Sequence, residues 1–291
     1  MDCGLLDRSE RGKLALTGED RKAFLNGQVT NDVEALAEGE GCYAAFLTPK
    51  GKMLGDLRIL DAGDELLLDT ERVALQPLFD MIRRFSIGHR VELHKRTVER
   101  GLLSLVGADP GEFELPPVEH AHRLASVGER PVRVVVTDEG VDVLCDAGDT
   151  DTVRAALLDG GARAMTDDEA EILRVERGRP RYGVDLDESV IPQEAGLNDR
   201  AVSFTKGCYV GQETVARLHY KGKPNRHLRG IRLREEAAPG TALHLGDREV
   251  GRITTAVVSP TLGPIALGFV RREAEPGTEL DLGEVVELPF A

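Results

Sequence analysis

Cys208 is the cysteine whose neighbours give it a chemical reason to react. It stands in the segment Lys206-Gly207-Cys208-Tyr209-Val210-Gly211, directly before a predicted short helix over residues 212–218. A helix N-terminus and a nearby ammonium group both favour the thiolate, which is the nucleophilic and metal-binding form of cysteine. A lone cysteine is more often a small buried apolar residue, and the local sequence alone favours that alternative. We therefore treat Cys208 as a candidate reactive thiol, with Lys206 beside it.

The other three cysteines, Cys3, Cys42 and Cys145, are interpreted as structural residues. Cys42 and Cys145 lie inside strand patterns, and no Cys-x-x-Cys pair or Cys/His spacing typical of zinc occurs. The sequence therefore predicts no metal site. Four cysteines in 291 residues do not make a disulfide scaffold, so we expect a reducing, cytoplasmic environment.

A second candidate feature is a basic seam in an acidic chain, defined here as Lys206 to Arg234. The whole chain has a formal net charge of −14, which disfavours stable nucleic-acid binding. The seam instead holds eight basic residues against the single acid Glu213. The basic residues are Lys206, Arg217, Lys221, Lys223, Arg226, Arg229, Arg232 and Arg234. A local excess of positive charge favours an anion site, although solvated basic faces would give the same pattern.

The third candidate feature is Glu176 in the segment Arg174-Val175-Glu176-Arg177-Gly178. The segment closes a predicted helix over residues 167–177, and an irregular Gly/Pro stretch that contains Tyr182 follows. Among so many arginines, salt bridging is the simpler account of Glu176 when only the local sequence is considered.

The elements that position these residues mix strands, hairpins and helices. The pattern predicts a helix over 19–26 with Thr17 as its N-cap, hairpins over 42–60 and 132–145, and helices over 72–85 and 150–159. Hairpins without strict alternation of strand and helix indicate an α+β fold. No apolar run is long enough to span a bilayer, so we expect no membrane association.

The last part of the chain, from about residue 227, reads as short strands separated by Gly/Pro turns. Predicted strands cover 227–234, 241–245, 249–259, 265–271, 279–282 and 285–288. Closely spaced strands of this kind favour a small β-barrel. We therefore expect an α+β region over 1–205 with two interleaved subdomains, a cysteine-containing segment and linker over 206–226, and a barrel over 227–291.

Taken together, the motifs resemble the YgfZ-type, folate-binding branch of the glycine-cleavage T-protein superfamily. The segment Lys206 to Glu213 (KGCYVGQE) resembles the signature of that branch. The segments 24–33 (FLNGQVTNDV) and 49–53 (PKGKM) with Arg58 resemble its N-terminal and hairpin motifs. The segments 250–254 (VGRIT) and 259–268 (SPTLGPIALG) resemble its barrel motif. The resemblance spans nearly the whole chain in the expected order.

The resemblance implies a ring of two interlocked, ferredoxin-like α+β units and a C-terminal β-barrel, with tetrahydrofolate as cofactor. Glu176 matches the family glutamate that contacts the pterin, and a carboxylate can accept a ring N–H and an amino group in parallel. Tyr182 would line the pterin slot. The basic seam, including Arg217, would face the anionic glutamate tail of the folate.

Two departures from the family patterns bear on activity. T-proteins carry an Asn-x6-Asp pattern whose aspartate assists the folate amine, and the matching positions here are Asp69 and Gln76. Glutamine cannot act as a carboxylate base, which argues against the T-protein mechanism. YgfZ relatives also use tryptophans at the folate pocket, and this chain has none. The sequence leaves open whether the chain is an enzyme.

The leading hypothesis is a tetrahydrofolate-binding accessory protein for iron–sulfur cluster assembly or repair, which supports cluster enzymes such as radical enzymes that modify tRNA. Cys208 would be the functional thiol, with Lys206 beside it. Because clusters usually need about four cysteine ligands, contact with a cluster would require an iron–sulfur partner protein. The alternatives are a folate-dependent aminomethyl or one-carbon transferase, and a non-catalytic folate-binding module in which Cys208 is inert.

Overall fold

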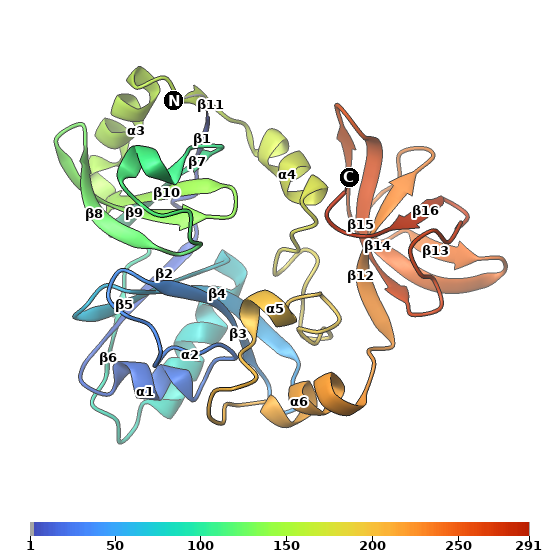
Figure 1. Cartoon of the computed structure of the whole chain (residues 1–291), viewed down its shortest axis with the longest axis horizontal. Coiled ribbons are helices and arrows are strands. Elements are labelled where there is room, and N and C mark those ends of the chain that lie inside the picture. Colours follow the sequence, from blue (N-terminus) through green and yellow to red (C-terminus); the bar gives the residue numbers. More distant parts are fainter. Residues whose placement is uncertain (1–2, 291) are drawn as a thin grey trace. The chain divides into compact units, whose positions relative to one another are not determined.

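A computed structural model describes residues 3–290, and three sheets carry most of the structure (Figure 1). The chain divides into two compact units. Unit 1 comprises the residues up to Leu47, Leu54–Thr166 and Arg200–Val210. Unit 2 comprises Thr48–Met53, Asp167–Asp199 and the residues from Gly211 onward. The domains predicted over 1–205, 206–226 and 227–291 stay a prediction, and the compact units divide the chain at other positions.

The first sheet of unit 1 has the strand order β3-β4-β5-β2-β6. Its strands are β2 (Gly12–Thr17), β3 (Gly41–Leu47), β4 (Met53–Asp61), β5 (Glu65–Thr70) and β6 (Glu92–Lys95). Its helices are α1 (Arg21–Asn26), the 3₁₀ turn η1 (Arg72–Ala74) and α2 (Leu75–Phe85). In the register of this sheet, Arg58 on β4 lies directly opposite Asp69 on β5, which allows the two charges to meet.

The second sheet of unit 1 has the order β11-β1-β7-β10-β9-β8. Its strands are β1 (Gly4–Asp7), β7 (Arg100–Val106), β8 (His122–Val127), β9 (Arg130–Thr137), β10 (Gly140–Asp146) and β11 (Arg163–Ala164). The turns η2 (Pro110–Phe113) and η3 (Ala147–Asp149) and the helix α3 (Thr150–Asp159) accompany it. The chain begins in this sheet, builds the first sheet with β2–β6 and then returns. The predicted interlocking of two α+β units is therefore confirmed.

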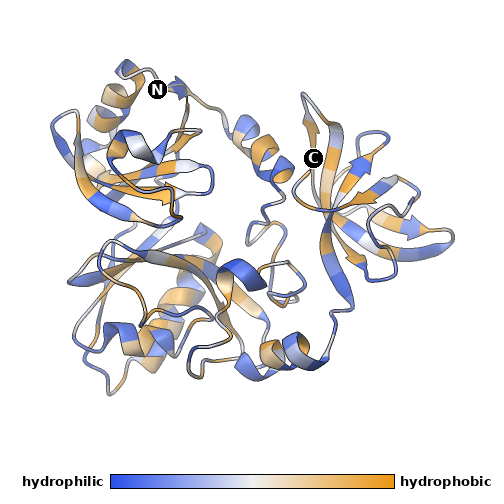
Figure 2. Cartoon of the chain, viewed as in Figure 1, coloured by the Kyte–Doolittle hydropathy of each residue, from blue (hydrophilic) through white to orange (hydrophobic). Residues whose placement is uncertain are grey.

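The two sheets of unit 1 meet through a small apolar cluster. Leu60 from the first sheet packs with Leu102, Val135 and Leu144 from the second, and Leu67 lies against them. A larger core under α3 contains Leu103, Val134, Val143 and Leu157. The buried residues of these two clusters include no aromatic side chain, whereas Phe24 on α1 and Phe46 on β3 are buried elsewhere in unit 1. Figure 2 shows hydrophobic and hydrophilic segments alternating along the strands and helices.

Unit 2 contains the third sheet, of order β13-β14-β15-β12-β16. Its strands are β12 (Arg226–Leu233), β13 (Ala242–Leu245), β14 (Arg248–Ser259), β15 (Gly263–Arg271) and β16 (Gly283–Val286). The two edges approach each other where the backbone N–H of Asp281 donates to the carbonyl of His244 at 3.1 Å. The predicted C-terminal barrel corresponds to this sheet. The helices of the later chain are α4 (Asp167–Glu176), α5 (Asn198–Ala201) and α6 (Gln212–Lys221).

Several local predictions need correction. The helix predicted over 19–26 begins at Arg21 with Asp20 at its N-cap position, so Thr17 is the last residue of β2 rather than a cap. The strand predicted over 279–282 is reduced to one isolated bridge between Glu279 and Glu284. The short strands β1, β6, β8 and β11 were not predicted. Within residues 3–290, no helix is long and apolar enough to cross a membrane.

Candidate functional site

Glu176 is held by the barrel through one carboxylate oxygen. It is the last residue of α4 and is half-buried, while its neighbour Val175 is fully buried against the core of unit 2. The hydroxyl of Ser259, at the end of β14, donates to Glu176 Oε1 at 2.5 Å. Ser259 Oγ in turn accepts the backbone N–H groups of Thr261 (3.2 Å) and Leu262 (3.0 Å). The carboxylate is therefore oriented, and each of its oxygens keeps acceptor capacity.

Arg174, the first residue of the Arg-x-Glu motif, fixes the end of α4. Its guanidinium donates to Asp185 Oδ2 at 2.7 Å, to Glu171 at 2.7 and 2.9 Å, and to Thr255 Oγ1 at 3.1 Å. Because these acceptors come from α4, from the turn after it and from β14, the guanidinium connects three segments of unit 2. Arg174 therefore fixes the end of α4 and, with it, the position of Glu176 two residues later.

Asp185 accepts hydrogen bonds from the hydroxyl groups of two neighbouring residues of one strand. Thr254 Oγ1 and Thr255 Oγ1 donate to Asp185 Oδ1 at 2.5 and 2.7 Å. Consecutive residues of a regular strand point to opposite faces, but the pairing of β14 with β15 shifts between Ile253 and Thr255. This β-bulge turns both hydroxyls toward one carboxylate. The side chain of Asp185 is completely buried.

Tyr182 and Arg217, the other two residues predicted to bind the cofactor, differ in exposure. Tyr182 is 8% exposed and lies opposite Leu186 in an isolated bridge of unit 2. Arg217 lies on the exposed face of α6.

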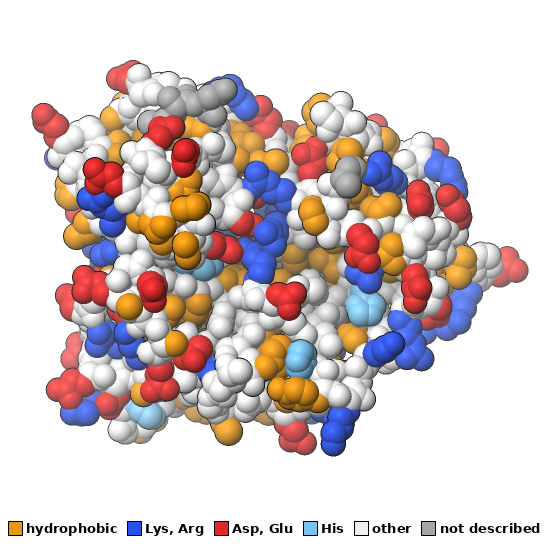
Figure 3. All heavy atoms as spheres, in the orientation of Figure 1, with side chains coloured by type: hydrophobic (Ala, Val, Ile, Leu, Met, Phe, Trp, Pro, Cys, Tyr) orange, Lys and Arg blue, Asp and Glu red, His pale blue; other side chains and the backbone are white. Residues whose placement is uncertain are grey.

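Part of the basic seam lines a cavity of about 600 Å³. Its lining includes Lys223, His227 and Arg229 of the seam, together with Arg271 and Arg272. Figure 3 shows basic side chains gathered at the lower edge of the barrel on the visible face.

Cys208 is exposed, whereas Cys3 and Cys145 are buried and Cys42 is intermediate. Two residues earlier, Lys206 is 9% exposed and its Nζ donates to backbone carbonyls of the segment 26–31. Burial lowers the pKa of Lys206 to about 8. Burial also raises the pKa of Cys42 to about 12, against a partial offset from Lys206. The exposed thiol is thus Cys208, the residue chosen from the sequence.

Gln76 and Asp69, the two positions matched to the T-protein pattern, have different environments. Gln76 is exposed on α2, and its side-chain amide donates to Asp80 on the same helix at 2.9 Å. Asp69 is 5% exposed on β5. Burial alone would raise the pKa of Asp69, but Arg58 and Arg11 outweigh it and hold the pKa at about 2. Asp69 is therefore ionised at neutral pH.

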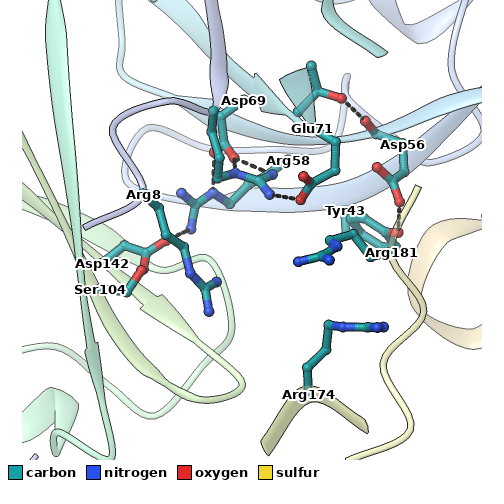
Figure 4. Close-up of polar contacts among 12 residues, drawn as sticks. Arg8, Tyr43, Asp56, Arg58, Asp69, Glu71, Ser104, Asp142, Arg174 and Arg181 are labelled. Carbon is teal, nitrogen blue, oxygen red and sulfur yellow. Dashed lines mark hydrogen bonds and ion pairs between the residues drawn. The ribbon is translucent and has the colours of Figure 1, made fainter. Parts of the chain in front are cut away.

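A buried charged network in unit 1 was not predicted. Arg58 donates to Asp69 and Asp142 at 2.6 Å each, and Ser104 donates to Asp142 at 2.6 Å. Figure 4 shows Arg58 between the two carboxylates. Arg11 joins the network through Asp69 and through an ion pair with Glu71. Its sequence signal is the pair Asp56 and Arg58, which are charged residues two positions apart in an apolar strand.

Next to this network lies a buried carboxyl group, Asp56, whose pKa is raised. The hydroxyl of Tyr43 on β3 donates to Asp56 Oδ2 on β4 at 2.6 Å. Asp56 is 6% exposed, and burial raises its pKa to about 6 although the Tyr43 hydrogen bond and the Arg11 charge act in the opposite direction. Within residues 3–290, no group of three or more His, Cys, Asp or Glu residues could hold a metal ion.

Two domain models match the chain. The GCVT N-terminal domain matches residues 1–112, and the glycine cleavage T-protein C-terminal barrel domain matches residues 226–287, which together exceed half of the chain. The chain belongs to the glycine-cleavage T-protein superfamily. This confirms the superfamily expected from the motifs; the YgfZ-type branch stays a prediction.

Relatives of the same superfamily match along nearly the whole chain. An Arabidopsis thaliana protein named as a chloroplastic transferase is 28% identical over 308 residues, covering 98% of this chain and 71% of the relative. An aminomethyltransferase of Rubrobacter xylanophilus is 28% identical over 310 residues, covering 99% and 82%. The glycine cleavage system aminomethyltransferase T of Bartonella henselae has the same fold. Its TM-score is 0.86 at 21% identity, with 100% of this chain and 86% of that chain covered.

Proposed function

We propose that this protein binds tetrahydrofolate and acts as an accessory protein in iron–sulfur cluster assembly or repair, with Cys208 as its functional thiol. The observation that carries the proposal is the exposure of Cys208 inside the segment Lys206-Gly207-Cys208-Tyr209, while Cys3 and Cys145 are buried. An exposed thiol is available to a partner protein, whereas a buried one is inert. The proposed partners are iron–sulfur assembly proteins or cluster-containing enzymes.

The chemistry of Glu176 fits a reduced pterin. Ser259 fixes one oxygen of the carboxylate, and the remaining acceptor sites can take a ring N–H and an amino group in parallel. When bound, tetrahydrofolate supplies reduced amines that carry one-carbon groups. In this proposal Glu176 binds and orients the ring, Tyr182 packs beside it, and Arg217 with other basic residues of the seam attracts the anionic tail.

The accessory role is favoured over aminomethyl transfer by the residue at position 76. Gln76 is exposed and bonded within its own helix, so it supplies neither a carboxylate nor a buried contact. The relative from Rubrobacter xylanophilus named as an aminomethyltransferase keeps transfer as the second candidate function. Measured aminomethyl turnover by the purified protein would establish that candidate instead.

The direct test of cofactor binding is titration of the purified protein with reduced folate. We expect wild-type binding in the micromolar range, which corresponds to about −8 kcal/mol. Glu176→Ala should weaken binding by at least about tenfold, because a hydrogen bond to a charged group contributes about 1.5–3 kcal/mol. Glu188→Ala removes an exposed carboxylate of unit 2 and serves as the control. Equal affinities for wild type and Glu176→Ala would refute the assignment of Glu176.

A further inference from the structure

The ammonium group of Lys206 donates hydrogen bonds to three backbone carbonyls. Nζ donates to the carbonyl oxygens of Asn26 (2.5 Å), Val29 (2.9 Å) and Asn31 (2.7 Å), which we call the carbonyl cage. The Lys206 residue is 9% exposed. Among the described residues, no carboxylate forms an ion pair with Nζ. All three N–H bonds of the ammonium are therefore used, and none is directed at the thiol of Cys208.

The segment that supplies the cage is itself fixed by side-chain hydrogen bonds. Asn26 Oδ1 accepts the backbone N–H of Val33 at 2.9 Å, and Asn31 Nδ2 donates to the carbonyl of Tyr43 at 2.8 Å. Thr30 Oγ1 donates to the carbonyl of Ala201 at 2.5 Å. The cage is thus a preformed site within unit 1, and Lys206 completes it from a segment about 180 residues later in the chain.

The cage accepts the protonated form of lysine specifically. A neutral amine has only two N–H bonds, so one of the three carbonyls would face its lone pair. Desolvation lowers the pKa of Lys206 to about 8, because the groups that oppose it, Asp32, Cys42 and Glu34, do not pair with it directly. With a pKa of about 8, the group is mostly protonated at neutral pH and loses its proton as the pH rises through 8.

Two exposed residues, Gly207 and Cys208, stand between the buried Lys206 and Tyr209. Tyr209 is 7% exposed, and Lys206 Nζ lies 5.3 Å from the centroid of its ring. Gly207 has no heavy atom within 4 Å of where a Cβ would stand, and Cys208 is exposed. The thiol therefore stands on a short turn between two buried side chains, Lys206 and Tyr209.

We propose that Lys206 is a positioning residue whose protonated ammonium, bound in the carbonyl cage, fixes the segment 203–209 and keeps the thiol of Cys208 exposed. Lys206 then acts on the thiol through the backbone rather than as a charge that activates it. The proposal also gives a physical reason for two motifs far apart in the sequence, since residues 26–31 form the cage and Lys206 fills it. It rests on the proposed function only for the use of the thiol.

The test is hydrogen exchange of the amides of residues 203–209 in the purified full chain, measured as protection factors between pH 6.5 and 9.5. Wild type should lose at least about tenfold in protection with a midpoint near pH 8, the pKa of Lys206. Constant protection of wild type across this range, together with equal protection of 203–209 in Lys206→Met, would overturn the proposal.

Two variants and a control extend the test. Lys206→Met should lower protection of 203–209 by at least about tenfold at every pH, and Lys206→Arg, which keeps its charge, should give a profile without the step near pH 8. Lys95→Met, an exposed lysine also placed over an aromatic ring, should match wild type.

Peptide-resolved alkylation of Cys208 separates positioning from thiol activation. Positioning predicts that wild type and Lys206→Met differ in alkylation rate below about pH 8, where Lys206 is protonated, and converge above it. A midpoint moved to higher pH in Lys206→Met, with unchanged exchange of 203–209, would instead establish direct activation. Neither measurement contains folate or a partner, so a failure of the proposed function leaves this result unaffected.

Discussion

Two buried aspartates on neighbouring strands, Asp56 and Asp69, have pKa values displaced in opposite directions. Asp56 is 6% exposed and Asp69 is 5% exposed, so burial alone does not separate them. Burial raises the pKa of Asp56 to about 6, because Tyr43 and Arg11 offset the desolvation only in part. The pKa of Asp69 is about 2, because Arg58 and Arg11 together outweigh the same effect. Direct contact with two guanidinium groups decides the difference.

The raised pKa of Asp56 predicts a stabilising substitution. A carboxyl whose pKa is raised on folding contributes stability below its unfolded value near 4, and this contribution is lost as the pH rises through about 6. Asp56→Asn stays neutral and can still accept from Tyr43. It should therefore be more stable than wild type at pH 7.5 by up to about 3 kcal/mol.

Chemical denaturation across pH values checks this prediction. The stability curves of wild type and Asp56→Asn should converge below about pH 3, where the aspartate is protonated in both states. A variant that is less stable than wild type at pH 7.5 would show that the ionised carboxylate of Asp56 is favourable in the fold.

The site could be predicted at the residue scale only where the chemistry lies in side chains. Cys208, Glu176 and Tyr182 have recognisable side chains in recognisable motifs. The partners of Lys206 are backbone oxygens of residues 175 to 180 positions away, and no side-chain pattern encodes them. The two threonine hydroxyls that donate to Asp185 are brought together by a β-bulge, and the residue types of β14 do not predict that bulge.

At the scale of elements, one arginine connects the two sheets of unit 1. Arg58 on β4 contacts Asp69 on β5 of its own sheet and Asp142 on β10 of the other, each at 2.6 Å. Ser104 on β7 satisfies the second oxygen of Asp142. The sheets therefore meet through this polar connection as well as through the apolar cluster of Leu60, Leu102, Val135, Leu144 and Leu67.

Removal of Arg58 should destabilise unit 1 strongly. Arg58→Leu removes the cation paired with the buried Asp142 and leaves Asp69 with Arg11 alone. Breaking a buried pair in this way costs about 3–5 kcal/mol. Chemical denaturation at pH 7.5 measures the loss. Arg123→Leu breaks an exposed ion pair with Glu114 and is the matched control, with an expected cost below about 1 kcal/mol. Similar losses for both variants would show that the buried connection contributes little.

The ion pair between Arg58 and Asp69 predicts that the stability of unit 1 falls at acid pH. Because the pKa of Asp69 is lowered to about 2, its contribution to stability is present above about pH 4 and is lost as the pH falls toward 2. Arg58→Leu should reduce this acid-dependent loss, since Asp69 then keeps only Arg11 as a cation. Thermal unfolding between pH 2 and 5 measures the effect. An unchanged pH slope in the variant would contradict the role of Arg58.

Strong periodic patterns allowed the elements to be predicted, and weak ones did not. The hairpins β3–β4 and β9–β10 and the helix α3 follow clear apolar patterns and were found with nearly correct ends. Strands β1, β6 and β8 are short, and the burial of β8 is irregular, so pairing with distant strands decides their structure. The prediction of Thr17 as a helix N-cap was wrong because β2 continues through that residue.

At the scale of the whole molecule, the chain carries both domains of the T-protein superfamily but lacks the acidic residue expected at position 76. Each compact unit supplies a different part of the proposed function. Unit 2 holds Glu176 with Ser259, and unit 1 holds Lys206 and Cys208. The predicted ring concerns the placement of these parts and stays a prediction, as does the assignment to a cytoplasmic protein.

The central claim, that the thiol of Cys208 supports iron–sulfur enzymes, is tested most directly by complementation of a strain that lacks this protein. The activity of a cluster enzyme that modifies tRNA is measured after expression of wild type, Cys208→Ser or Cys145→Ser. The buried Cys145 lies near Thr150 Oγ1, so a serine there keeps a polar partner and serves as the control. We expect wild type and Cys145→Ser to restore activity and Cys208→Ser to fail. Full restoration by Cys208→Ser, at equal protein levels, would contradict the account.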